Sequence, residues 1–203
     1  MPLDEAPQNG YMDVPSGKLA AVVTYLEMRT FPEPLHDEAD GASEFQLRHV
    51  ARPELEWYRS LYRAVGENWL WSSRLAKDDA DLLAIVRHPA VDVHALTHKG
   101  RDRGILELDR RRFPEIELAF FGVAPELVGR GAGRFLIGRA VELARSFKPD
   151  RFWLHTCTLD HPKAIGFYRQ AGFTAYRRAV QILDDPRVAG YLPRTAGPQV
   201  PIL

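Results

Sequence analysis

The segment from Glu117 to Leu136 constrains the fold of this 203-residue chain more than any other. Its first part, Glu117-Leu-Ala-Phe-Phe-Gly-Val123, is an apolar run typical of a strand, and a glycine-rich turn then leads into a helix over about residues 131–147. Such a turn presents free backbone amides and the positive end of a helix dipole, so it binds anions without a charged side chain. The segment therefore predicts a phosphate-binding site beside a strand.

The glycine spacing excludes two common phosphate sites. With Gly129 and Gly131 as the first pair of a dinucleotide fingerprint, the third glycine would fall at Arg134. A triphosphate-binding P-loop ends in Gly-Lys-Ser or Gly-Lys-Thr, whereas this turn ends in Gly133-Arg-Phe135. Neither a Rossmann site nor a P-loop is expected.

Two motifs resemble those of the GNAT acetyltransferase superfamily. The turn Val128-Gly-Arg-Gly-Ala-Gly133 is similar to its pyrophosphate loop, Q/R-x-x-G-x-G/A, with Val128 in place of the leading Gln or Arg. The run Ala164-Ile-Gly-Phe-Tyr-Arg-Gln-Ala-Gly-Phe173 resembles the second motif, N-x-x-A-x-x-x-Y-x-x-x-G-F, with His161 at the usual Asn position. Because Val128 carries no polar group, the backbone amides are expected to supply the pyrophosphate contacts.

The order of expected elements is also that of the GNAT architecture. The resemblance implies an α/β fold of mixed α+β type, with a central mixed, mostly antiparallel sheet that is splayed between its fourth and fifth strands and flanked by helices. The patterns predict strands over 18–28, 91–98, 105–108, 115–123, 151–158 and 173–183, helices over 53–66, 77–87, 131–147 and 162–171, and an exposed loop over 31–41.

The chain is expected to form one domain. A 45% hydrophobic content over 203 residues suffices for one sizeable core. We predict an irregular N-terminal lead-in over 1–17, a single GNAT acetyltransferase domain over 18–183, and a proline-rich coil tail over 184–203.

Charge and cysteine content restrict the partners and the compartment. Lys plus Arg and Asp plus Glu number 27 each, so no net field favours nucleic acid or an anionic membrane. The single cysteine, Cys157, excludes an intramolecular disulfide and fits a reducing compartment. No apolar run is long enough for a membrane span, and the N-terminus lacks the features of a signal peptide. We expect a cytoplasmic protein with no nucleic-acid or membrane partner.

Direct acetylation of an amine requires a base, and Glu117 is the first candidate. It stands at the head of an apolar strand, where burial raises the pKa of a carboxylate, and family members with a strand glutamate as base place it at this distance from the glycine turn. The alternative is a solvated glutamate facing the arginines at 110–112. Glu107 on the preceding strand, usually a solvated position, and His155 on the strand before the second motif are the other candidates.

The resemblance also implies the other site residues. Tyr168 matches the tyrosine that, in many family members, protonates the coenzyme A thiolate or donates a hydrogen bond to its sulfur, although its helix face would also suit a core residue. Backbone amides near a bulge in the 115–123 strand would polarise the thioester, and Gly122 suits a bulge or a close backbone approach. The residues expected to bind acetyl-CoA are Phe121, Gly122, Val123, Val128, Gly129, Arg130, Gly131, Ala132, Gly133, Arg134, His161 and Tyr168.

Three further features have weaker functional interpretations. Cys157 would permit an acetyl-cysteine route, but a lone strand cysteine is usually inert. His94 and His98 can share a strand face, but no third ligand is evident and no metal is expected. An aromatic cluster borders the expected acceptor pocket and could line it or form core; its members are Trp57, Tyr58, Tyr62, Trp69 and Trp71.

Together these features predict an acetyl-CoA-dependent N-acetyltransferase that works by direct attack in a ternary complex. The acceptor would be a small-molecule or peptide amine, and the resemblance allows a homodimer. Two alternatives remain: a non-catalytic acyl-CoA-binding module on the same fold, which Val128 and His161 favour, and an acyltransferase that uses longer acyl-CoA donors.

Overall fold

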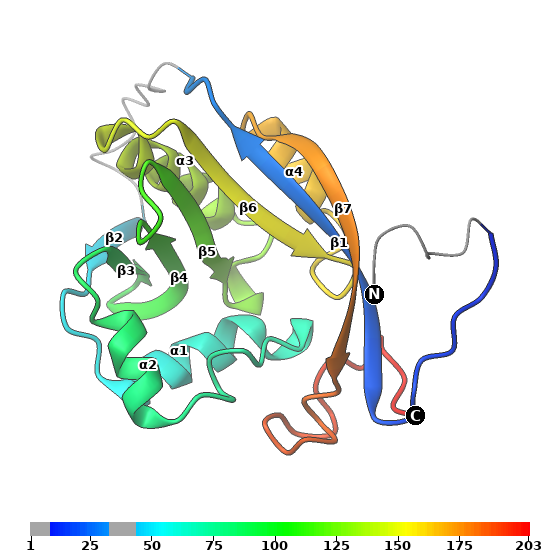
Figure 1. The fold of residues 1–203 in the computed structure, drawn as a ribbon. Coiled ribbons are helices and arrows are strands. Elements are labelled where there is room, and N and C mark those ends of the chain that lie inside the picture. Colours follow the sequence, from blue (N-terminus) through cyan, green and yellow to red (C-terminus); the bar gives the residue numbers. More distant parts are fainter. Residues whose placement is uncertain (1–8, 33–43) are drawn as a thin grey trace.

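A computed structural model describes residues 9–32 and 44–203. Seven strands form one sheet in the order β2-β3-β4-β5-β6-β1-β7, and every neighbouring pair is antiparallel except β5 and β6. Helices α1 and α2 cover one face of the sheet, and α3 and α4 cover the other (Figure 1). This mixed, mostly antiparallel sheet confirms the predicted fold class. The strands are β1 Lys18–Met28, β2 Phe45–His49, β3 Val91–His98, β4 Arg101–Asp109, β5 Glu115–Val123, β6 Arg151–Cys157 and β7 Thr174–Asp184, and the helices are α1 Leu55–Gly66, α2 Asp79–Val86, α3 Ala132–Ser146 and α4 Ala164–Gln170.

Several local signals act as the sequence predicts. The Asp78 side chain caps α2 by accepting a hydrogen bond of 2.8 Å from the amide of Asp81. Lys99 and Gly100 have φ angles of 48° and 73° in the tight turn that joins β3 to β4. Residues 1–8 of the expected lead-in and 33–41 of the expected loop lie outside the described part of the chain.

Two strand predictions need correction. Strand β2 was not predicted, because only Phe45 of its five residues is buried and the alternation of apolar residues is weak. Strand β4 begins at Arg101 rather than at Ile105, because Arg101, Asp102 and Gly104 pair with β3 although this segment is polar and ends in glycine. In both cases, pairing with β3 determines the conformation.

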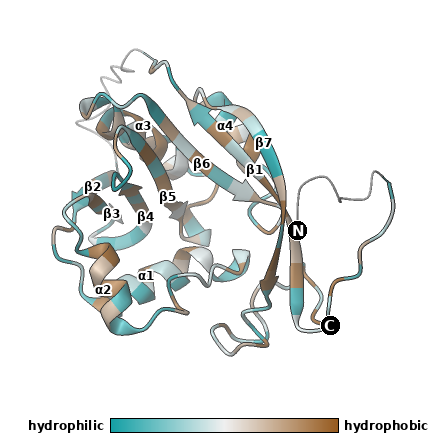
Figure 2. Cartoon of the chain, viewed as in Figure 1, coloured by the Kyte–Doolittle hydropathy of each residue, from teal (hydrophilic) through white to brown (hydrophobic). Residues whose placement is uncertain are grey.

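The two faces of the sheet carry separate cores. The core beneath α3 includes Leu106, Ile116, Leu136 and Phe152, all fully buried. The core beneath α1 includes Tyr58, Tyr62 and Ile105, also fully buried. Figure 2 shows hydrophobic residues on both β4 and β5. The central strands β4 and β5 are thus covered on both faces over part of their length.

The segment after β7 has no helix or strand, yet it is packed against the domain. The side chain of Arg187 is buried and forms an ion pair of 2.7 Å with Asp185. It also donates hydrogen bonds to carbonyl oxygens of residues 196, 197, 200 and 201. Leu192 and Ala196 share a small core with Leu19 and Leu70. The tail therefore supports the segment that follows α1.

Within the described residues, no helix combines the length and apolar character needed to cross a membrane.

Candidate active site

The site lies where β5 and β6 separate. The two parallel strands pair only from Glu115 to Glu117, opposite Arg151 to Trp153, and then diverge (Figure 1). Across the described residues, the β5 edge from Leu118 to Val123 has no strand beside it on the β6 side. Its free amides and carbonyls can pair with an extended ligand, as those of a sheet edge pair with an added strand.

A cavity of about 660 Å³ occupies this gap. Its walls come from β5 and β6, the segment after α1, the turn before α3, α4 and β7. Lining residues include Glu117, Phe120, Phe121, Gly122, Val123, Val128, Gly129, Gly133, His155, His161 and Tyr168. The structure thus brings both predicted catalytic residues and much of the predicted cofactor site to one cavity.

The strand bulge lies earlier than the sequence suggests. Leu108 pairs with Leu118 and Glu107 pairs with Phe120, which leaves Ala119 as the extra residue of β5. Gly122 instead allows the close approach of neighbouring side chains to the β5 backbone. A Cβ atom at this position would lie 2.5 Å from Val65 and 3.3 Å from Trp71, so glycine is needed to admit the α1 side of the cavity wall.

The glycine turn has the conformation of an anion site. Gly129 and Gly131 have φ angles of 81° and 90°, which favour glycine, and nothing lies within 4 Å of a Cβ added at either. Gly131 caps α3, and the first helical bond runs from the amide of Phe135 to the Gly131 carbonyl at 3.0 Å. The amides of 132–134 have no backbone acceptor in the described chain, and no side chain caps the helix. These open donors fit a pyrophosphate group.

The side chains of the turn differ in what they can contribute. Val128 is 49% exposed and offers only apolar surface at the cavity edge. Ala132 is fully buried in the core beneath α3, so only its amide can face a ligand. Arg130 and Arg134 are exposed beside the turn, outside the cavity lining, and neither has an ion-pair partner among the residues that the structure describes. They are available as cations near the anion site.

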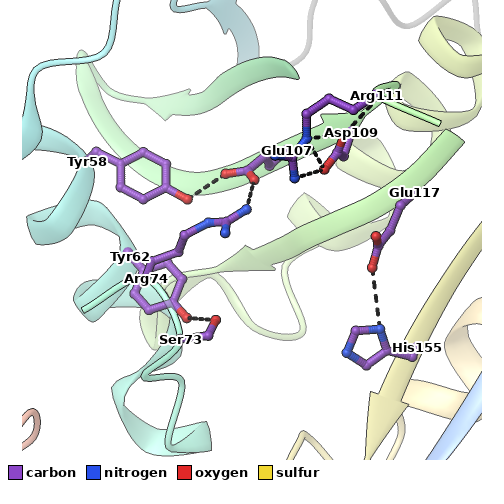
Figure 3. A network of polar contacts seen from close by, with 9 residues as sticks. All are labelled: Tyr58, Tyr62, Ser73, Arg74, Glu107, Asp109, Arg111, Glu117 and His155. Carbon is purple, nitrogen blue, oxygen red and sulfur yellow. Dashed lines mark hydrogen bonds and ion pairs between the residues drawn. The ribbon is translucent and has the colours of Figure 1, made fainter. Parts of the chain in front are cut away.

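Glu117 and His155 face each other across the gap. A carboxylate oxygen of Glu117 lies 3.5 Å from Nδ1 of His155, and the Glu117 side chain is 26% exposed (Figure 3). The nearby arginines have other partners, since Arg110 pairs with Asp92 and Arg111 with Asp109. Two of the three candidate bases are thus in contact at the cavity surface.

The third candidate, Glu107, is fully buried and does not line the cavity, which corrects the expectation of a solvated carboxylate. One of its oxygens accepts a hydrogen bond of 2.5 Å from the hydroxyl of Tyr58, and the other pairs with Arg74 (Figure 3). Burial, reinforced by the Glu107 charge, raises the pKa of Tyr58 well above its ordinary value. With both oxygens occupied, Glu107 is a structural anion in this arrangement.

Asp109 and Arg111 form a second neutralised pair at the cavity wall. Asp109 lies opposite Glu117 in the strand register, and Arg111 contacts both of its carboxylate oxygens at 2.6 to 3.0 Å. Although burial opposes it, Arg111 holds the pKa of Asp109 below its ordinary value. The sequence places the arginines at 110–112 near Glu117 but does not indicate Asp109, because only the β4–β5 register sets Asp109 opposite Glu117.

Tyr168 lies on α4 and lines the cavity. Its ring packs against Phe121 and Phe173 at centroid distances of 5.9 and 6.1 Å. Its hydroxyl has no hydrogen-bond partner in the part of the chain described. Burial, with a contribution from the Asp160 charge, raises the pKa of this phenol. Tyr168 is therefore a neutral hydrogen-bond donor whose ring is held by core contacts.

Asp160 links the C-terminal end of β6 to Trp71 on the opposite wall of the cavity. Its carboxylate accepts hydrogen bonds from Trp71 Nε1 at 3.1 Å, Thr156 Oγ1 at 2.8 Å and the amide of Cys157 at 2.8 Å. Burial and this carboxylate raise the pKa of Cys157 to about 11. The thiolate that an acetyl-cysteine route would need is therefore disfavoured.

His161, which occupies the usual asparagine position of the second motif, is already engaged by two neighbouring residues. Its ring packs edge to face on Trp69 at 5.2 Å, and its Nδ1 accepts a hydrogen bond of 3.1 Å from the amide of Lys163. Lys163 is exposed and lines the cavity, so it adds a cation that the motif does not specify. Its place in the motif, between His161 and Ala164, is the sequence signal for this position.

The aromatic cluster divides between core and cavity. Tyr58 belongs to the core beneath α1, and Trp57 packs at its edge and donates a hydrogen bond of 2.8 Å to Asp102. The other three line the cavity, namely Tyr62, Trp69 and Trp71.

In the described ranges, no group of three His, Cys, Asp or Glu side chains is placed to hold a metal ion. His98 instead contacts Glu44, and His94 packs on His49.

Comparisons with known proteins agree with this geometry. A model of the acetyltransferase (GNAT) family matches residues 26–173. A putative GNAT acetyltransferase from Novosphingobium aromaticivorans is 19% identical, with a TM-score of 0.55 over 86% of this chain and 70% of its own. A GCN5-related N-acetyltransferase from Sphaerobacter thermophilus is 13% identical, with a TM-score of 0.59 over 81% of this chain and 52% of its own.

An aminoglycoside acetyltransferase from an uncultured soil sample, solved with trehalose, is 16% identical, with a TM-score of 0.55 over 70% of this chain and 95% of its own. At these identities the likeness concerns the fold. This chain spans about half of the Sphaerobacter protein and 63% of a functionally unknown protein from Staphylococcus epidermidis. No curated protein matches the sequence.

Proposed function

The chain belongs to the acetyltransferase (GNAT) family, and we propose that it transfers an acetyl group from acetyl-CoA to an amine acceptor by direct attack in a ternary complex. One observation carries the proposal: the unpaired β5 edge is followed, after the turn over 124–131, by the open amides of the α3 N-terminus, beside a cavity lined by Glu117 and Tyr168. An extended thioester arm and a pyrophosphate need these two donor surfaces in this order.

The residues that would hold the donor follow from the open hydrogen-bonding groups. The amides of the turn and of the first turn of α3 would bind the pyrophosphate, and Arg130, Arg134 and Lys163 would add positive charge near it. The free edge of β5 at Phe121–Val123 would align the pantetheine arm and polarise the thioester carbonyl.

Glu117 would accept the proton of the acceptor amine, directly or with His155, whose ring nitrogen lies 3.5 Å away. The neutral amine then attacks the thioester carbonyl carbon, a C–N bond forms, and the C–S bond breaks. The attacking nitrogen loses its excess proton to water, and the thiolate takes up a proton from water. Tyr168 would donate a hydrogen bond to the departing thiolate sulfur, which suits a phenol whose raised pKa keeps it protonated. The geometry favours Glu117 over Glu107, because both Glu107 oxygens already have partners.

Incubation of the purified chain with acetyl-CoA and a set of amines, followed by detection of the coenzyme A thiol, tests the proposal. We expect thiol release that depends on the amine, and comparison with propionyl-CoA and longer donors tests the choice of acetyl. A cytoplasmic location and a possible homodimer remain predictions from the sequence.

A non-catalytic acyl-CoA-binding module is the second candidate. The apolar Val128 and the engagement of His161 by Trp69 and Lys163 favour it, because both positions lack the usual polar contacts. Tight coenzyme A binding without turnover of any amine would support this module and contradict the acetyltransferase.

A further inference from the structure

Charged side chains around the cavity are mostly neutralised by one another. Arg74 pairs with the buried Glu107, and Arg111 pairs with Asp109. Each of these two arginines is therefore balanced by a carboxylate and offers no unpaired guanidinium to a ligand. Lys163, which also lines the cavity, is the cation that the proposed function assigns to the pyrophosphate. The Nε atom of Arg74, a residue that lines the cavity, is buried and has no hydrogen-bond partner in the described structure.

The remaining carboxylates of the cavity wall are Glu117 and Asp160. Three neutral donors already occupy the oxygens of Asp160. Glu117 has only the His155 contact of 3.5 Å and is partly exposed to the cavity. One carboxylate thus remains with capacity for a cationic group.

An aromatic wall adjoins this carboxylate. Tyr62, Trp71 and Phe120 line the cavity and contact one another at centroid distances of 5.0 to 5.5 Å. Glu117 and Phe120 project to the same side of β5, because the extra residue at Ala119 lies between them. Leu183 adds an aliphatic surface to the cavity wall.

From these observations we infer that the acceptor is a small primary monoamine with an aromatic body and no carboxylate. Its ammonium group would meet Glu117, and its ring would pack on the Trp71 and Phe120 side of the cavity. A polyamine or aminoglycoside would bring several charges to one available carboxylate. An amino acid would bring a carboxylate to a wall whose arginines are already paired. This inference rests on the proposed acetyltransferase activity.

The volume of the cavity favours a small acceptor. About 660 Å³ must hold both the acyl end of the donor and the acceptor. The wall on the α1 side cannot recede easily, because Tyr62 and Val65 are buried and Gly122 is already in close contact with Val65 and Trp71.

The test compares kcat/KM at saturating acetyl-CoA for 2-phenylethylamine, propylamine, phenylalanine, spermidine and kanamycin. We expect 2-phenylethylamine to exceed each of the others by about tenfold or more, a typical selectivity of an apolar pocket. Equal values, or a preference for spermidine, kanamycin or phenylalanine, would overturn the inference and leave the acetyltransferase activity standing. Tight acetyl-CoA binding without acetylation of any amine would instead overturn the activity, and the inference with it.

A variant with an added carboxylate in the cavity provides a second test. Gln181 lines the cavity from β7 and is exposed, so Gln181→Glu adds a second carboxylate with little change of shape. We expect it to raise kcat/KM for spermidine relative to 2-phenylethylamine by about fivefold or more, whereas Gln170→Glu on α4, outside the cavity lining, should leave the ratio unchanged. An unchanged ratio in Gln181→Glu would contradict the single-carboxylate account of specificity.

Discussion

The Nδ1 atom of His155 lies 3.5 Å from a carboxylate oxygen of Glu117, across the gap where β5 and β6 separate. The strands carry these groups from opposite sides of the cavity, so an amine that enters the gap reaches both. This relationship makes Glu117 the base that can be tested first.

Replacement Glu117→Gln keeps the shape of the side chain but removes its ability to accept a proton. We expect kcat/KM to fall by about 100-fold, most strongly near and below neutral pH, where the acceptor amine is protonated. A pH–rate profile of wild type and variant measures this effect.

Glu115→Gln is the matched control, since Glu115 lies on the same strand, is 43% exposed and contacts Arg151 at 3.4 Å outside the cavity lining. Its profile should equal that of wild type. If Glu117→Gln also leaves the profile unchanged, Glu117 is not the base.

Replacement Tyr168→Phe removes one hydroxyl and keeps the ring contacts with Phe121 and Phe173. We expect kcat to fall by about tenfold or more while the dissociation constant for coenzyme A changes less, because the hydroxyl acts when the thiolate leaves. Steady-state kinetics and calorimetric titration separate the two effects. Tyr176→Phe on the exposed strand β7 is the control, and equal turnover in both variants would leave Tyr168 with a packing role only.

Replacement Gly131→Glu places bulk and negative charge at the cap of α3. Gly131 has a φ angle of 90°, so any side chain there strains the turn, and a carboxylate also repels a pyrophosphate. We expect coenzyme A binding to be lost in a titration with folded protein. Gly131→Ala measures the strain alone, and Gly138→Glu adds the same charge farther along α3, where a Cβ meets open space. Retained affinity in Gly131→Glu would remove the turn from the cofactor site.

The sequence predicted the parts of the site that local patterns encode. The β5 strand, the glycine turn and the α3 helix were found because periodicity, glycine spacing and helix signals all lie within one segment. The burial of Glu107 was not predictable, because Tyr58 and Arg74, which neutralise it, come from a distant helix and loop. The bulge at Ala119 likewise depends on the β4 register rather than on any residue that favours a bulge.

Outside the segment from β5 to α3, long-range contacts also produce structure that local sequence patterns do not predict. Strand β2 forms because its five residues pair with the edge of β3. The tail after β7 packs against the domain because Arg187 donates hydrogen bonds to several of its carbonyl oxygens. The sequence patterns predict no element for the first segment and a coil for the second. Long-range pairing decides both.

His94 makes stability depend on pH. It is 7% exposed, and burial, followed by the nearby His49, lowers its pKa from 6.5 to about 4. As the pH falls below about 6.5 the unfolded chain takes up this proton first, so the folded state loses stability progressively until about pH 4. The loss is on the order of 3 kcal/mol. Urea denaturation at pH 7.5 and about pH 4.5 should show a smaller decrease for His94→Leu than for wild type, and equal decreases would refute this origin.

Arg187 holds the C-terminal segment through a buried ion pair. Replacement Arg187→Leu leaves Asp185 buried without its partner and frees several carbonyl groups. We expect the free energy of unfolding to fall by about 3–5 kcal/mol, measured by urea denaturation. Lys18→Ala, which breaks the exposed pair with Asp184, should cost less than about 1 kcal/mol. Similar small losses in both variants would mean that the tail does not contribute as the contacts indicate.

Mass spectrometry of the amine product tests the central claim most directly. Wild-type protein, acetyl-CoA and 2-phenylethylamine are incubated together, and coenzyme A release is followed in parallel. We expect one acetyl group on the amine for each coenzyme A released, with both signals strongly reduced in Glu117→Gln. Coenzyme A binding without any acetylated product, from this amine or from any other in the panel, would contradict the assignment of this cavity as an acetyltransferase site.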